Sequence, residues 1–184
     1  MPGWQDVDDI QLLTKAKMGE AEAFGELYER YAQSIFRFLY AHVTDRLDAE
    51  DLTEEVFLRV WRSLPGYQEQ GVPFLAFLFR IARNALIDFY RRSGRSGQHM
   101  SLNVQPIPDL LADPSASVSV NLEYQEIRQT LTKLKDEYRT VLVLRFLNDL
   151  SPEETSRAMG RTPGAVRILQ HRALVALRSL LEGT

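Results

Sequence analysis

The sequence predicts an all-α protein made of two small helical domains joined by a flexible linker. Apolar residues recur at helical spacing through most of the chain. That periodicity fails between about residues 93 and 119, where prolines and serines are scattered without a pattern. Near the C-terminus, two helix-start signals follow one another closely. We therefore expect one domain over residues 1–95, a linker over 96–119 and a second domain over 120–184.

The composition is that of an ordinary soluble protein, with 45% hydrophobic and 26% charged residues in a chain of 184. The chain has no cysteine, which excludes disulfides and thiolate metal sites. No apolar run is long enough to span a bilayer, and no signal peptide opens the sequence. These features predict a cytoplasmic protein that does not insert into a membrane.

The net charge is −3, but the two signs are unevenly distributed. Acidic residues crowd the segment from Asp45 to Glu55, whereas arginines crowd the segment from Arg80 to Arg95. Lysine is absent between Lys17 and Lys133, so arginine carries almost all the positive charge there. An acidic face and a basic face indicate two kinds of partner.

The first two helices are expected over residues 8–18 and 20–43. The second has a stripe of large apolar side chains at i, i+3 and i+4 spacing, which we interpret as core. Its members are Phe24, Leu27, Tyr28, Tyr31, Ile35, Phe38 and Leu39.

A third helix is expected over residues 47–64, with Asp48 as its N-cap. Its inward face is formed by Leu52, Val56, Val60, Trp61 and Leu64. Its opposite face is formed by Asp51, Glu54, Glu55, Leu58 and Arg62. That face is either a solvated acidic surface or a contact surface, with a leucine anchor inside an acidic rim, for a basic partner.

Residues 65–73 form a loop bounded by proline and glycine. Within it, Tyr67 and Gln68 could hold an unstacked base, or the aromatic ring could pack against a helix. A fourth helix follows over residues 74–92, with a buried stripe and a basic face. The stripe consists of Phe74, Leu78, Ile81, Ala85 and Phe89. The basic face consists of Arg80, Asn84, Ile87 and Arg91, with Arg83 and Tyr90 beside it.

Charged and flat side chains on one face suit a nucleic-acid strand, because the charges bind phosphates and the flat groups stack on bases. The alternative is a solvated basic face whose arginines pair with the acids of the third helix.

Beyond the linker, helices are expected over residues 120–134 and 137–147. They share a core made of Leu122, Ile127, Leu131, Leu134, Val141, Leu144 and Phe146. A helix-turn-helix is expected next. Ser151, Pro152 and Glu154 form a capping box, Gly160 ends that helix, and Thr162 with Pro163 starts another.

The last helix has an inward face of Val166, Leu169, Ala173, Leu177 and Leu180. Arg167, His171, Arg172 and Arg178 lie on its outer face, and the small Gly164 and Ala165 occupy its first turn. A positive N-terminus, small residues and outward hydrogen-bond donors are what a DNA-recognition helix requires. A helical hairpin that serves only packing is the alternative.

With these residues in view, the chain resembles the bacterial extracytoplasmic-function sigma factors, a class of RNA polymerase sigma factors. Residues 23–31 (AFGELYERY) resemble the opening of that family's region 2, and residues 48–61 (DAEDLTEEVFLRVW) resemble its polymerase-binding motif. Residues 77–92 (FLFRIARNALIDFYRR) resemble its promoter-melting segment, and the C-terminal stretch resembles region 4. The resemblance implies a promoter-specificity factor with no catalytic chemistry and no cofactor.

The resemblance also implies three sets of contacts. The first set binds the clamp coiled coil of the largest polymerase subunit: Asp51, Glu54, Glu55, Leu58 and Arg62. The second set holds the melted minus-10 strand: Tyr67, Gln68, Arg80, Arg83, Asn84 and Arg91. The third set reads the minus-35 duplex: Arg161, Thr162, Gly164, Arg167, Ile168, His171 and Arg172. Core RNA polymerase, including the flap of its second-largest subunit, promoter DNA and an anti-sigma factor are the implied partners.

The recognition helix departs from the family pattern. Ile168, Leu169, Leu174 and Val175 stand where the family usually has polar and basic residues. A contact at Ile168 would therefore be apolar, for example to a thymine methyl.

Three other functions are compatible with parts of the sequence. One is a stand-alone helix-turn-helix regulator that binds palindromic DNA without polymerase. Another is a nuclease in which acids of the third helix bind a metal, although these acids point several ways. They are Asp48, Glu50, Asp51, Glu54 and Glu55. The third is an interaction scaffold, which the basic fourth helix argues against.

Overall fold

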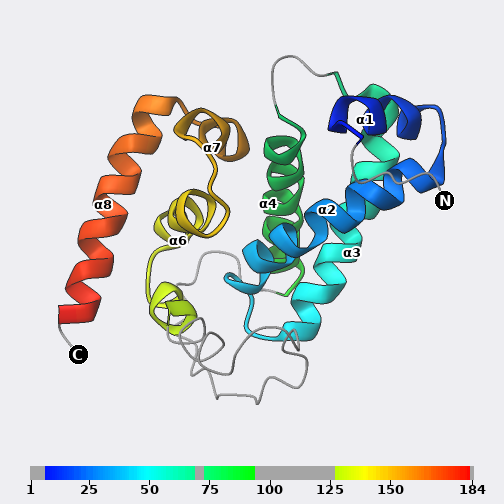
Figure 1. The fold of residues 1–184 in the computed structure, drawn as a ribbon. Coiled ribbons are helices and arrows are strands. Elements are labelled where there is room, and N and C mark those ends of the chain that lie inside the picture. The colour runs from blue at the N-terminus through cyan, green and yellow to red at the C-terminus, as the bar shows by residue number, and fades with distance from the viewer. Residues whose placement is uncertain (1–6, 69–72, 94–126, 183–184) are drawn as a thin grey trace.

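The computed structural model describes residues 7–68, 73–93 and 127–182, and every regular element in these ranges is helical (Figure 1). The predicted all-α class is therefore confirmed. None of the helices in the described ranges is both long and apolar enough to cross a membrane. The N-terminal helices are α1 (Asp9–Lys17), α2 (Ala21–Tyr40), α3 (Arg46–Ser63) and α4 (Phe74–Arg92).

The start of α3 differs from the prediction. Its N-cap is Asp45, whose extended backbone lets the side chain accept a hydrogen bond of 3.0 Å from the amide of Leu47. The assignment of the N-cap to Asp48 is therefore wrong, because a carboxylate three residues earlier already satisfies a free amide. Asp48 lies in the first turn, where the helix dipole favours a negative charge.

The core of the N-terminal helices is formed by apolar side chains of α2, α3 and α4. Phe38 and Phe79 pack edge to face, with ring centroids 5.4 Å apart. The predicted α2 stripe is confirmed for Leu27, Ile35, Phe38 and Leu39, which are fully buried. Tyr28 is an exception: it is exposed, although one side of its ring packs on Phe57.

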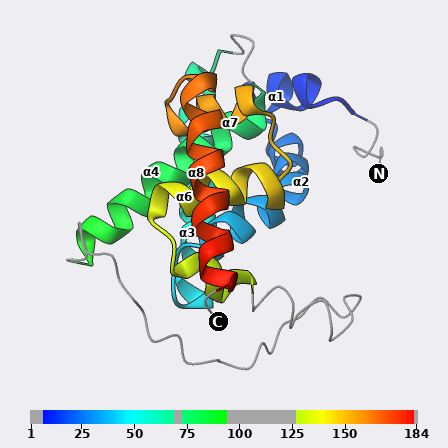
Figure 2. The same cartoon turned by 90° about the vertical axis from the view of Figure 1, so that its left-hand side faces the viewer.

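The C-terminal helices are α6 (Asp136–Leu142), the π-helix η3 (Val143–Leu147), α7 (Pro152–Met159) and α8 (Pro163–Glu182). They are preceded by helical residues 127–132. Figures 1 and 2 show α6 and α7 between α8 and the N-terminal helices, which leaves α8 on the outside.

The predicted core of this half is confirmed for Leu131, Leu134, Val141 and Leu144 and is wrong for two residues. Phe146 is 52% exposed because it lies in the π-helix, whose wider turn takes it off the apolar face. Ile127 is 49% exposed, because at this point of the helix the side chain of the neighbouring Arg128 points into the protein and is buried. The predicted linker over 96–119 and Leu122 lie outside the described residues.

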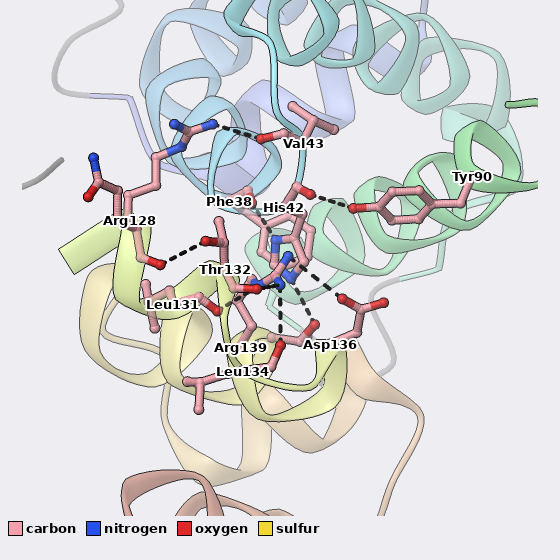
Figure 3. Close-up of polar contacts among 12 residues, drawn as sticks. Phe38, His42, Val43, Tyr90, Arg128, Leu131, Thr132, Leu134, Asp136 and Arg139 are labelled. Carbon is pink, nitrogen blue, oxygen red and sulfur yellow. Dashed lines mark hydrogen bonds and ion pairs between the residues drawn. The ribbon is translucent and has the colours of Figure 1, made fainter. Parts of the chain in front are cut away.

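The two halves meet where α4 packs against α7. They also meet where Arg128 reaches the end of α2 (Figure 3). The guanidinium of Arg128 donates to the carbonyl oxygens of Tyr40, Val43 and Thr44 at 2.8, 2.8 and 3.0 Å. It also lies 3.9 Å from the centroid of the Tyr40 ring. Carbonyls at a helix C-terminus have no partner within the helix. Arg128 therefore caps α2 from the other half of the chain.

The region where the two halves meet is called the interdomain joint below. Its second polar contact is made by the buried side chain of His42. Its Nδ1 lies 2.7 Å from the carbonyl oxygen of Phe38, and its Nε2 lies 2.9 Å from the hydroxyl of Thr140. A neutral ring satisfies both contacts if Nδ1 donates and Nε2 accepts. Burial, together with the nearby charge of Arg139, lowers the pKa of His42 to about 3. His42 is therefore neutral in the folded chain near neutral pH.

The joint should weaken as the pH falls. In the unfolded chain His42 takes up a proton near its ordinary pKa of 6.5, whereas the folded chain leaves it neutral down to about pH 3. The unfolded state thus binds more protons between these values, and the free energy of unfolding decreases as the pH falls through that window. Between about pH 7 and pH 5 we expect a loss on the order of 1–2 kcal/mol from this group.

Urea unfolding of the wild-type chain and of His42→Gln at both pH values measures this contribution. The wild type should lose more stability than the variant, because the other titrating groups are common to both. An equal loss in the two proteins would contradict the assignment.

Candidate nucleic-acid and protein interfaces

The acidic face of α3 points away from the core as predicted. Asp51, Glu54, Leu58 and Arg62 are exposed, and Leu58 keeps 56% of its surface accessible. Leu47 is also exposed and precedes Asp51 by four residues, so it extends the same face by one turn. Leu47 is not among the predicted contact residues, although its spacing of four residues from Asp51 places it on this face. The face thus has a leucine near each end and carboxylates between them.

Glu55 differs from its neighbours on this face because it is half-buried and bonded within the chain. Arg59 donates to its Oε1 at 2.5 Å and Arg92 to its Oε2 at 3.1 Å. Arg59 also donates to Asp88 of α4 at 2.8 Å. Burial opposes ionisation of Glu55, but the two arginine hydrogen bonds outweigh it and lower its pKa below the ordinary value. Glu55 therefore ties α3 to α4.

The ring of Tyr67 is buried between α4 side chains rather than presented to solvent. Its centroid lies 4.5 Å from that of Phe77 and 5.9 Å from that of Phe74, with the Lys17 ammonium 5.2 Å away. This is the second of the two predicted arrangements, in which the aromatic packs against a helix. The neighbouring Gln68 is exposed.

The basic face of α4 is arranged as the spacing predicts. Its exposed members are Arg80, Asn84, Ile87 and Arg91, and Arg83 is half-buried beside them. The Arg80 guanidinium lies 5.4 Å from the Phe77 ring centroid, which places a flat cation on an aromatic platform. Arg91 lies 3.7 Å from Asp88. The face is thus a row of donors beside aromatic rings.

The helix-turn-helix forms as predicted. The Ser151 hydroxyl accepts from the Glu154 amide at 3.1 Å, and the Glu154 carboxylate accepts from the Ser151 amide at 2.7 Å. Gly160 adopts a φ of 63°, a left-handed conformation that costs glycine little. Thr162 then caps α8 by accepting from the Ala165 amide at 3.2 Å.

The predicted division of α8 into two faces is also present. Val166, Leu169 and Ala173 are buried, whereas Leu177 and Leu180 are half-buried. The predicted duplex-contacting residues are all exposed on one side of the motif: Arg161, Thr162, Gly164, Arg167, Ile168, His171 and Arg172.

Two arginines of this surface form ion pairs with acids of other helices, and neither pair was predicted from the sequence. Arg161 donates to Glu137 of α6, and Arg167 donates to Glu153 of α7 at 3.3 Å. Neither pair has a spacing that reveals it in the sequence, because the partners lie on different helices.

The acids of α3 do not converge on a common point. Glu50 accepts from Arg46 at 2.8 Å, while Glu55 is bonded to Arg59 and Arg92. Within the described ranges, no group of three or more histidines, cysteines or acids is placed to hold a metal ion.

Comparisons with known proteins match both halves of the chain. The family profile described as Sigma-70 region 2 matches residues 27–96, and the profile described as Sigma-70, region 4 matches residues 124–177. The ECF RNA polymerase sigma factor BldN of Streptomyces coelicolor is 35% identical over 94% of this chain. The chain spans 65% of the length of BldN. SigD of Mycobacterium tuberculosis, another ECF sigma factor, is 32% identical over 91% of this chain and 81% of its own.

Solved structures extend the likeness to the fold. The structure of CnrH in complex with the cytosolic domain of CnrY superposes with a TM-score of 0.74 at 26% identity, covering 97% of this chain and 99% of that one. The sigma factor RpoE from Bartonella quintana, in complex with the anti-sigma factor NepR, gives a TM-score of 0.69 at 21% identity over 86% of this chain and 96% of its own. The likeness to RpoE shows a shared fold.

The two neighbouring glutamates of α3 should respond differently to loss of charge. Glu55→Gln removes the charge that bonds Arg59 and Arg92, so we expect it to lower the free energy of unfolding by about 0.5–1.5 kcal/mol. Glu54→Gln, its matched control, lies on the exposed face and should change stability by less than about 0.5 kcal/mol. Denaturant titrations of both variants measure the difference, and equal effects would contradict a structural role for Glu55.

Proposed function

The chain belongs to the ECF RNA polymerase sigma factors, and on this premise we propose that it binds core RNA polymerase and directs it to promoters. The observation that carries the proposal is that one chain matches both region 2 and region 4 and exposes a candidate contact face in each. A stand-alone regulator would not need the region 2 half. We assign residues 1–95 to region 2, 96–119 to the linker and 120–184 to region 4.

The proposed polymerase contact is the outer face of α3. Leu58 supplies an apolar anchor, and Asp51, Glu54 and Arg62 surround it with charge suited to the clamp coiled coil of the largest subunit. Leu47 extends the contact by one turn. Glu55 contributes indirectly, since its bonds to Arg59 and Arg92 fix α3 against α4.

The proposed contact with the melted minus-10 strand is the basic face of α4 and the loop before it. Arg80, Arg83 and Arg91 would bind phosphates, and Asn84 and Gln68 would hydrogen-bond bases. Tyr67 could stack on a base only by leaving its contacts with Phe74 and Phe77.

The proposed minus-35 contact is the N-terminal half of α8 with the turn before it. Arg161, Arg167 and Arg172 would bind phosphates or guanine, and the small Gly164 allows close approach. His171 and Thr162 add hydrogen-bonding groups. Ile168 is 59% exposed among these polar residues and suits a thymine methyl.

Further partners are proposed from the relatives. The sigma factor RpoE, which shares the fold, is solved in complex with the anti-sigma factor NepR, and this supports an anti-sigma partner for this chain. The flap of the second-largest polymerase subunit is the proposed second contact on polymerase, through region 4. We propose a cytoplasmic location, and no catalytic residue or cofactor is assigned.

The two halves must separate when the promoter is bound. The minus-10 and minus-35 elements lie about 25 base pairs apart, or roughly 85 Å of B-form duplex at about 3.4 Å per pair. A compact chain of this length has a radius of gyration of only about 16 Å. The interdomain joint therefore has to open, and the linker has to extend.

Run-off transcription with core polymerase on a genomic fragment library tests the proposed function. The wild-type chain should support specific initiation, and Leu58→Asp should abolish it by placing a charge at the apolar anchor. Leu181→Asp is the matched control, because Leu181 is 60% exposed at the far end of α8. No initiation with the wild type, or equal loss in both variants, would contradict the proposal.

The promoters found in this way allow a test of Ile168. Replacing the contacted thymine by deoxyuridine removes one methyl group and should weaken binding about fourfold, from about 0.8 kcal/mol per buried methyl-sized group. The same replacement should have no effect on Ile168→Ala. If no thymine of the minus-35 element shows this dependence, Ile168 does not read a methyl group.

A further inference from the structure

Two of the three arginines on the proposed minus-35 surface already have an anionic partner within the chain. Arg161 is bonded to Glu137 of α6, and Arg167 is bonded to Glu153 of α7 at 3.3 Å. All four side chains lie on the surface, where DNA would approach. Arg172, the third arginine, makes no ion pair with any residue in the described ranges.

A carboxylate and a phosphate group present similar oxygens to a guanidinium. Arginine binds both through the same planar set of N–H donors, so the two anions compete for it. A DNA phosphate that binds Arg161 or Arg167 must displace the glutamate or share the guanidinium with it. In either case the negatively charged carboxylate remains close to the negatively charged DNA backbone and repels it.

We propose that Glu137 and Glu153 are internal competitors of DNA phosphate and that they lower the affinity of the region 4 half for duplex DNA. This inference rests on the proposed minus-35 contact. Its consequence is that the free chain binds promoter DNA weakly. Attachment to polymerase raises the local concentration of duplex, and binding then proceeds despite the competition.

The proposal has a direct rival. Ion pairs on a protein surface can instead hold an arginine in the orientation that DNA requires, in which case their removal weakens DNA binding. The two ideas predict changes of opposite sign, so one measurement separates them.

The experiment uses the full chain with Glu137→Gln, Glu153→Gln and both together. Glutamine preserves the size of the side chain, and thermal unfolding verifies that each variant is folded. The probe is a fluorescent duplex of about 20 base pairs with random sequence, titrated by anisotropy at roughly 50–200 mM salt. Each single variant should bind about two- to fivefold more tightly, the range that an exposed ion pair is worth, and the double variant about the product.

A matched control separates competition from a general change in net charge. Glu182 forms an ion pair with Arg178 at 3.3 Å near the end of α8, away from the proposed contacts. Glu182→Gln removes the same charge from the same half and should change the affinity by less than about 1.5-fold. A gain equal to that of Glu153→Gln would overturn the proposal.

A double-mutant cycle tests the pairing itself. The gain from Glu153→Gln should disappear when Arg167 is also changed to alanine and should persist when Arg172 is changed instead. Weaker or unchanged binding of the two glutamine variants would overturn the proposal, as would a gain that survives Arg167→Ala. The proposal would also be overturned if the chain carrying both Glu137→Gln and Glu153→Gln showed no measurable DNA binding at about 50 mM salt.

Run-off transcription by the same variants separates this inference from the proposed function. If the wild-type chain supports initiation and the glutamine variants bind DNA no better, only the competition is refuted. If no variant supports initiation with core polymerase, the proposed function itself fails.

Discussion

The capping of α2 by Arg128 is the contact on which the arrangement of the two halves depends. A buried guanidinium is costly unless its donors are satisfied, and Arg128 donates to the last carbonyl oxygen of α2, that of Tyr40, and to those of Val43 and Thr44 just after it. His42 adds a second polar contact to Thr140 of the other half. Because these bonds form in only one geometry, they give the joint a defined register.

The joint is polar only in part, because α4 and α7 also pack within an apolar core cluster that spans both halves. Carbonyl, imidazole and guanidinium groups that part from one another are hydrated, so separating them costs less than exposing the same area of apolar surface. Apart from Tyr67, whose ring is buried, the closed chain leaves the proposed contact residues exposed or half-buried yet keeps them within a compact body. Opening is therefore needed to position these faces along the promoter rather than to uncover them.

The sequence predicted the helices and their faces well because these depend on local signals. The bounds of α4, the capping box of Ser151 and Glu154, and the exposure of Leu58 all follow from spacing and capping chemistry. The error at Asp45 arose because two aspartates could cap the same helix. Phe146 was misplaced because a π-helix changes the periodicity on which the prediction relied.

The features that the sequence did not predict are contacts between distant residues. Arg128 reaches a carbonyl 85 residues away, and His42 meets Thr140 across 98 residues. The pairs Arg161–Glu137 and Arg167–Glu153 likewise join separate helices. An arginine in a sequence carries no sign of whether it binds solvent, a carbonyl, a carboxylate or DNA. Only the packing of the helices determines this.

A distance measurement tests most directly whether the two halves are closed in the free chain and separate on the promoter. The chain has no cysteine, so Ser63→Cys in α3 and Ser179→Cys in α8 introduce two unique labelling sites at exposed positions. Pulsed electron paramagnetic resonance between spin labels at these sites should give one narrow distance for the free chain. In the complex with core polymerase and promoter DNA the distance should increase by tens of ångströms. The same distance in both states would contradict the account.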